Sequence, residues 1–189
     1  VMSDSEIVQL VRPLVIEMAP YRSARDEFED FDAQKIFLDA NETPYNTNVN
    51  RYPDPLQRRL KRVLAKAKGV SADQILLGNG SDEVLDLIFR TFCEPGQDEV
   101  ILLPPTYGMY GVLAQLNNVK TVNVPLDDNF QLDVAAIMSS VNEKTKLVFV
   151  CSPNNPSGNA IPLPQIQSLL DQFSGLVVVD EAYIDFSTA

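Results

Sequence analysis

The 189-residue sequence contains no histidine. This absence excludes Ser-His and Cys-His nucleophile pairs and removes the commonest metal ligand. Any proton transfer must therefore use lysine, tyrosine or a carboxylate. There are only two cysteines, Cys93 and Cys151, and their spacing matches no zinc ligand set. Each ends an apolar stretch, so we interpret both as small buried thiols.

Basic residues are also scarce, and long apolar runs are missing. Fifteen basic against twenty-six acidic residues give a net charge of -11, which opposes the phosphate-neutralising surface that nucleic-acid binding requires. No apolar run approaches the ~20 residues of a membrane span. The first ten residues include Asp4 and Glu6 in place of a basic signal-peptide start. We therefore expect a cytoplasmic location, with neither a nucleic acid nor a membrane as partner.

The remaining composition, 45% hydrophobic and 22% charged, is typical of a soluble globular protein. Its patterning predicts an α/β fold with a largely parallel sheet. We expect strands at residues 74–77, 99–103, 120–124, 146–150 and 176–179. We expect helices at residues 56–64, stopped by Gly69, and at residues 82–92, 110–116, 134–138 and 164–173. Residues 147–150 and 176–179 are continuously apolar, which is typical of strands covered on both faces.

Two segments precede this pattern and differ from it. Residues 4–35 are too mixed in composition to bury a continuous face, so we expect an arm that packs on another part of the protein. Residues 39–55 are rich in asparagine and proline, which predicts a long loop. Long loops of this kind often carry function.

Polar residues follow several expected strands, at the edge where open α/β sheets bind ligands. The first group is Gly78-Asn79-Gly80-Ser81-Asp82, which opens an expected helix. Free N–H groups and the Ser81 hydroxyl suit a phosphate at a helix N-terminus. The alternative is a tight turn capped by Ser81. The group lacks the spacing of a Walker loop or a dinucleotide-binding turn.

Three more groups follow later strands. Tyr107 and Tyr110 offer a ring that could lie flat on an aromatic ligand, or else both are half-buried. Asn155 could point its amide into the crevice, or it could simply open a turn. Asp180, with Tyr183 after it, follows three valines, and a buried acid there must be hydrogen-bonded or paired. Its carboxylate suits a cationic ring nitrogen, with a helix cap as the alternative.

This order of motifs resembles the fold-type-I pyridoxal-phosphate enzymes, and among them the histidinol-phosphate aminotransferases. The resemblance covers essentially all 189 residues and is carried by residues 11–13, 20–25, 38–42, 51–53, 104–110, 151–158 and 179–183. It implies a three-layer α/β/α large domain with a mostly parallel sheet, incomplete in this chain, plus an N-terminal arm. Residues 1–35 would form the arm and a small-domain segment. Residues 36–189 would form the N-terminal part of the large cofactor-binding domain.

The resemblance also implies site residues for pyridoxal 5′-phosphate. Ser81 and Asp82 would hold its phosphate, Tyr107 would stack on its ring, Asn155 and Tyr183 would bond its phenolic oxygen, and Asp180 would bind its pyridine nitrogen. Tyr52 would reach the cofactor phosphate of the partner subunit, which makes the active form a homodimer. Tyr21 and Asn41 would line the substrate site.

The reaction implied by the resemblance is amino transfer between L-histidinol phosphate and 2-oxoglutarate in histidine biosynthesis, reversibly giving imidazole-acetol phosphate and glutamate. The resemblance implies that the Schiff-base lysine and the arginines that bind the substrate carboxylate lie beyond Ala189. Lys144 and Lys146 precede a strand and are expected at a solvent-exposed edge, so neither would replace that lysine. Two further strands of the family's sheet would lie between residues 74–77 and residues 146–150. We therefore expect a central gap in this chain's sheet, and a chain that is unstable and inactive alone.

Other functions stay open at this point. A fold-type-I enzyme acting on another phosphorylated amino acid, such as threonine-phosphate decarboxylase, shares most of these motifs. A noncatalytic interaction or regulatory fragment would keep the sheet but not the chemistry. A nucleotide-binding α/β module is disfavoured, because the chain has no Walker or Rossmann glycine pattern.

Overall fold

The computed structural model describes residues 4–21 and 38–187. The chain separates into two compact units. One comprises Val1–Glu17 and Gly78–Ala189, and the other comprises Met18–Leu77. The domain boundary expected between residues 35 and 36 lies outside the described residues, so it stays a prediction.

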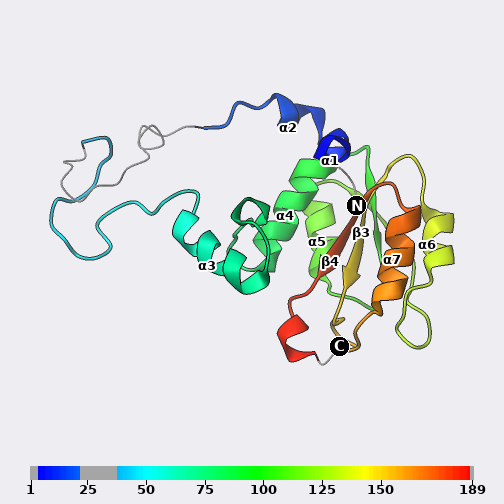
Figure 1. Ribbon diagram of the computed structural model, residues 1–189. Coiled ribbons are helices and arrows are strands. Elements are labelled where there is room, and N and C mark those ends of the chain that lie inside the picture. Colours follow the sequence, from blue (N-terminus) through cyan, green and yellow to red (C-terminus); the bar gives the residue numbers. More distant parts are fainter. Residues whose placement is uncertain (1–3, 22–37, 188–189) are drawn as a thin grey trace. The chain divides into compact units, whose positions relative to one another are not determined.

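The larger unit is built on a four-stranded parallel sheet (Figure 1). Its strands are β1 (Glu99–Leu102), β2 (Lys120–Asn123), β3 (Thr145–Cys151) and β4 (Leu176–Asp180). Their order across the sheet is β2-β1-β3-β4. The parallel α/β prediction is confirmed, and these four strands lie within one or two residues of their expected bounds.

Helices cover both faces of this sheet (Figure 1). On one face, α4 (Ser81–Phe92) and α5 (Met109–Leu116) bury Phe89 and Tyr110 against Phe149 of β3. On the other face, α6 (Val134–Ser140) and α7 (Leu163–Gln172) bury Ile137 and Leu169 against strand residues that include Val148. Alternate side chains of a strand point to opposite faces, so β3 contributes to both cores. The three-layer arrangement is confirmed.

The two strands expected to be covered on both faces differ in the structure. In β3, Leu147 to Val150 are fully buried. In β4, residues 176–178 are only half-buried and Val179 is 36% exposed. The physical reason is position, because among the described strands β4 pairs with β3 alone.

One strand prediction was wrong. Gln74 ends a single turn of 3-10 helix, η2 (Ala72–Gln74), and residues 75–77 form no strand because no described strand pairs with them. The described strands form a continuous sheet, in which β3 pairs with β1 on one side and β4 on the other. Because residues 74–77 pair with none of them, the gap expected between those residues and β3 stays a prediction. Among the described strands, the sheet has two open edges, the outer side of β2 and the outer side of β4.

The expected packing of the arm is seen at Arg12, between α1 (Asp4–Leu10) and α2 (Pro13–Glu17). The Arg12 backbone N–H donates to the Thr91 carbonyl at 2.9 Å. Its guanidinium donates to the Arg90 carbonyl at 2.8 Å and pairs with Glu94 at 3.0 Å. These bonds tie the chain start to the end of α4.

The smaller unit contains α3 (Arg58–Lys68) and η2. Gly69 ends α3 in a left-handed conformation, with φ of 70°, as the sequence predicts. Among the described residues, none of the helices has both the length and the apolar character that crossing a bilayer needs.

Candidate functional site

The candidate site lies at the carboxyl edge of the larger unit's sheet. Loops that follow β1, β3 and β4 meet there because parallel strands all end on the same side. The segment that leads into α4 belongs to the same unit.

The N-terminus of α4 begins at Ser81, with Asp82 in its first turn. Gly80 precedes it with φ of 80°, a backbone conformation that disfavours any side chain. As a glycine, Gly80 provides no side-chain cap for the first-turn N–H groups. Glu83 instead accepts a bond from the Asn79 backbone N–H and so closes the preceding loop. The first-turn donors and the Ser81 hydroxyl make this end of α4 suited to an anion.

Tyr107 connects this helix end to the loop after β1. Its hydroxyl donates to the Asp82 carboxylate, with Oη lying 3.3 Å from Oδ1. Burial raises the pKa of Tyr107, and the Asp82 carboxylate raises it further, with smaller effects from Tyr183 and Asp180. The phenol therefore keeps its proton at neutral pH. The same effects show that four predicted site residues lie close together: Asp82, Tyr107, Asp180 and Tyr183.

Asp180 is the last residue of β4 and is only 9% exposed. Its Oδ2 accepts a bond from the Tyr110 hydroxyl at 2.7 Å. Its Oδ1 accepts one from the Ala182 backbone N–H at 3.0 Å. The expectation that a buried acid here must be hydrogen-bonded is confirmed. The helix-cap alternative is wrong, since the next helical turn, η3 (Ile184–Phe186), is preceded by Tyr183.

Asn155 and Tyr183 line one cavity of about 320 Å³, together with Phe186 and the neighbouring residues of the loop after β3. Asn155 is half-buried and Tyr183 is 47% exposed. The two polar side chains are therefore available at a common opening. An amide and a phenol there can both donate hydrogen bonds to a ligand oxygen.

Asn154 is a structural residue that sequence reasoning missed. It is 3% exposed, and its amide donates to the Pro105 carbonyl at 2.9 Å and to the Ser157 hydroxyl at 2.7 Å. Its Oδ1 accepts from the Thr106 hydroxyl at 3.1 Å. These bonds join the loops after β1 and β3. The paired asparagines of the sequence were a signal, but sequence cannot say which of the two turns inward.

Tyr110 is the second missed residue. The residues alone left open which tyrosine would stack, and the resemblance assigned Tyr107 and gave Tyr110 no role. In the structure, Tyr110 is fully buried while Tyr107 is half-buried. The two rings meet edge to face, with centroids 5.6 Å apart and planes at 87°.

Three predicted residues, Tyr21, Asn41 and Tyr52, belong to the smaller unit. Tyr21 and Tyr52 are 92% and 61% exposed. The Tyr52 backbone N–H donates to Glu42 at 2.7 Å, which holds the loop locally. Their roles stay predictions.

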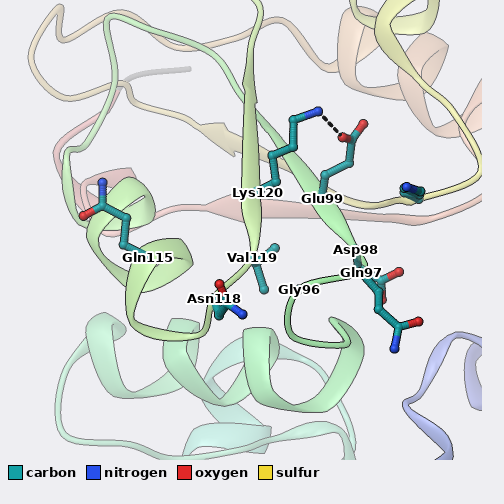
Figure 2. A pocket seen from close by; sticks show the side chains of 9 residues that line it. Gly96, Gln97, Asp98, Glu99, Gln115, Asn118, Val119 and Lys120 are labelled. Atoms are coloured by element: carbon teal, nitrogen blue, oxygen red, sulfur yellow. Dashed lines mark hydrogen bonds and ion pairs between the residues drawn. The ribbon is translucent and has the colours of Figure 1, made fainter.

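A second cavity, of about 460 Å³, lies at the opposite edge of the sheet (Figure 2). It is lined by Glu99 and Lys120, whose side chains pair at 3.0 Å, and by Lys144. Lys146 is the second residue of β3 and lies at the same amino end. Neither of these last two lysines follows a strand into the candidate site, in agreement with the sequence interpretation.

Comparison with known proteins places this arrangement in a family. The sequence model for aminotransferase class I and II matches residues 26–189. A protein named histidinol-phosphate aminotransferase from Christiangramia forsetii is 56% identical over 186 residues, which are 98% of this chain and 53% of that protein. One of the same name from Flavobacterium johnsoniae is 57% identical over 187 residues, 98% of this chain and 54% of that protein. The chain spans about half the length of the curated relatives it matches.

Solved structures agree on the fold. Histidinol-phosphate aminotransferase from Sinorhizobium meliloti, in complex with pyridoxal-5′-phosphate, matches with a TM-score of 0.66 at 26% identity, over 72% of this chain and 38% of that one. The enzyme of the same name from Clostridium acetobutylicum matches with a TM-score of 0.64 at 28% identity, over 74% of this chain and 41% of that one. With its parallel sheet, its polar strand ends and these matches, the chain belongs to the aminotransferase class I and II family.

Proposed function

We propose that this chain forms the cofactor-binding part of a pyridoxal-phosphate-dependent histidinol-phosphate aminotransferase. The observation that carries the proposal is the buried Asp180 carboxylate at the end of β4, held by Tyr110 and Ala182 and close to Tyr107. A fixed anion in this position is what a protonated pyridine nitrogen needs.

The other described residues of the larger unit fit the same cofactor. The N-terminus of α4 at Ser81 and Asp82 suits the phosphate. Tyr107 offers a half-buried aromatic ring for stacking. Asn155 and Tyr183 offer two donors at one cavity for the phenolic oxygen. The phosphate, the ring nitrogen and the phenolic oxygen of the cofactor thus each have a chemically matching group at one edge of the sheet.

When bound, pyridoxal phosphate supplies an electron sink for bond breaking at the substrate's α-carbon. The role proposed for Asp180 is to keep the ring nitrogen protonated. Tyr107 orients the ring, and its own hydroxyl keeps its proton because burial and Asp82 raise its pKa. Asn155 and Tyr183 hold the phenolic oxygen by donating hydrogen bonds.

The proposed substrates are L-histidinol phosphate and 2-oxoglutarate, with imidazole-acetol phosphate and glutamate on the other side of the equilibrium. Support comes from relatives named histidinol-phosphate aminotransferase at more than half identity. Tyr21 and Asn41 are proposed to contact substrate. Tyr52 is proposed to reach the cofactor phosphate of the partner subunit in a cytoplasmic homodimer.

The proposal also needs a lysine for the covalent link to the cofactor and for proton transfer. In the described part of the larger unit, the lysines are Lys120, Lys144 and Lys146, and they lie at the amino ends of the strands. We propose that the required lysine lies beyond Ala189 and that the 189-residue chain alone is inactive.

The test uses the natural gene product that contains this chain. Borohydride reduction with pyridoxal phosphate present, followed by intact-mass measurement, should give one cofactor adduct on a lysine beyond Ala189. Histidinol phosphate and 2-oxoglutarate should then yield glutamate. The absence of glutamate from these two substrates, or the absence of any adduct, would contradict the proposal.

A matched pair of variants sharpens this test. Asp180→Asn keeps the size of the side chain but removes its charge, and most of the transaminase activity should be lost. Asp133→Asn makes the same chemical change at the exposed N-cap of α6, where asparagine caps equally well. Equal activities of the two variants would count against the role of Asp180.

A further inference from the structure

Tyr110 carries a hydroxyl into the core of the larger unit. Its side chain has no exposed surface, and its Oη lies 2.7 Å from Oδ2 of Asp180. The two residues come from different elements, α5 and β4, and are 70 positions apart in the chain. A buried hydroxyl needs a hydrogen-bond partner, and the partner of Tyr110 is Asp180, the carboxylate proposed to bind the ring nitrogen of the cofactor.

Aromatic packing holds the Tyr110 ring in one orientation. The ring stacks on Phe149 of β3, with centroids 5.0 Å apart and planes at 22°. Phe149 in turn stacks on Phe89 of α4, with centroids 5.1 Å apart. Full burial and this stacking leave the ring little freedom to turn. The hydroxyl therefore stays directed at Asp180.

The hydroxyl also stays a donor. Burial and the bond to Asp180 both raise the pKa of Tyr110 far above its ordinary value of 10.0. The phenol is thus protonated at neutral pH, and it donates its proton to the carboxylate. The Asp180 carboxylate then has one donor on each oxygen, Tyr110 on Oδ2 and the Ala182 backbone N–H on Oδ1. Two donors on two oxygens define the plane of the carboxylate.

We propose that Tyr110 is a positioning residue that fixes the Asp180 carboxylate for the ring nitrogen of the cofactor. The inference rests on the proposed function, because it assigns Tyr110 a task at that same site. Tyr110 also contacts the second proposed ring-binding residue, since its ring meets Tyr107 edge to face at 5.6 Å. One buried side chain thereby supports both the carboxylate and the stacking tyrosine.

The test compares Tyr110→Phe with Phe89→Leu in the natural gene product. Tyr110→Phe removes only the hydroxyl. The dissociation constant of the apoprotein for pyridoxal phosphate should rise roughly tenfold, the lower end of what a hydrogen bond to a charged group contributes. With cofactor labelled with nitrogen-15 in its ring, the ring-nitrogen resonance should move toward the unprotonated pyridine position.

Phe89→Leu is the matched structural control. Phe89 belongs to the same stack and is equally buried, but its side chain carries no hydrogen-bonding group. It should lower the thermal stability while leaving the ring-nitrogen resonance in place. A shift of the resonance in Phe89→Leu as large as in Tyr110→Phe would overturn the proposal, because general loosening of the core would then explain both.

A double-mutant cycle tests whether Tyr110 acts through Asp180. In an Asp180→Asn background, adding Tyr110→Phe should change cofactor affinity by less than about twofold. An undiminished effect in that background, or unchanged affinity in Tyr110→Phe alone, would overturn this inference while leaving cofactor binding by the wild type intact. Failure of the wild type to bind the cofactor would instead overturn the proposed function, and this inference with it.

Discussion

Glu99 provides a quantitative test of how the strand starts are held together. It begins β1, is 2% exposed, and binds groups from three neighbouring segments. Lys120 of β2 donates to it at 3.0 Å, the Thr145 hydroxyl of β3 donates at 3.3 Å, and Asn142 donates from the preceding loop. Figure 2 shows the ion pair with Lys120 among the side chains that line the cavity.

The partners differ in exposure, and this decides which bond matters most. The Lys120 side chain is 73% exposed, so its ion pair should contribute at most about 1 kcal/mol. Hydrogen bonds to a buried charged group contribute about 1.5–3 kcal/mol. We therefore expect Glu99→Gln to lower the free energy of unfolding by about 2–3 kcal/mol and Lys120→Met to lower it by less than about 1 kcal/mol.

The effect should depend on pH in a defined direction. Burial alone raises the pKa of Glu99, but the hydrogen bonds from Lys120 and Asn142, the charge of Lys120 and the bond from Thr145 outweigh burial and lower it below the ordinary 4.5. The folded state thus favours the charged form. The stabilisation is complete above the unfolded value of 4.5 and is lost as pH falls through the lowered folded value.

Urea unfolding of the natural gene product and both variants, followed by circular dichroism from about pH 7 to about pH 3, measures these differences. The difference in free energy of unfolding between wild type and Glu99→Gln should be constant near neutral pH and should shrink in acid. The reasoning is refuted if Lys120→Met costs as much as Glu99→Gln, or if the Glu99→Gln difference is unchanged at the lowest pH.

Three further tests concern the larger unit. Burial and Asp98 raise the pKa of Cys93 to about 12. This thiol should therefore resist a chromogenic disulfide reagent at about pH 8 until the protein is unfolded, and rapid reaction of the native thiol would contradict this. Gly78→Ala would put a Cβ 2.8 Å from Val84 Cγ2, and should lower the free energy of unfolding by about 1–3 kcal/mol, read as a lower urea midpoint. Asp133→Ala removes the acceptor of the Ala136 N–H at 2.9 Å and should cost about 1 kcal/mol, while Asp133→Asn should cost almost nothing; equal midpoints would disprove the cap.

Much of the fold was predictable because the apolar pattern is strong where the sheet is buried. Residues 147–150 are apolar on both faces, and the structure buries them between two helix layers. Gly69 stops α3 because only glycine takes the left-handed cap easily. The pattern misled at residues 74–77, because a β-rich tetrapeptide becomes a strand only where another strand pairs with it.

The candidate site was predictable to the level of its loops. Parallel strands end on one side, so Tyr107 and Asp180 could be assigned to one edge from the sequence. Asp82 was assigned there from an expected strand at residues 74–77 that the structure does not contain, and its bond from Tyr107 is what brings it to this edge. The residues alone could not decide between near neighbours, and only the resemblance assigned roles to Tyr107 and Asn155. Tyr107 and Tyr110 have the same side chain, and so do Asn154 and Asn155.

The sequence by itself determined which residue types stand at the strand ends, and therefore the chemistry available there. Only the tertiary structure decided that Tyr110 turns into the core to bond Asp180 while Tyr107 meets Asp82. It likewise turned Asn154 inward to join two loops. The physical reason is that a local pattern sets the direction of a side chain relative to its own element, whereas burial and hydrogen-bond partners come from elements distant in the chain.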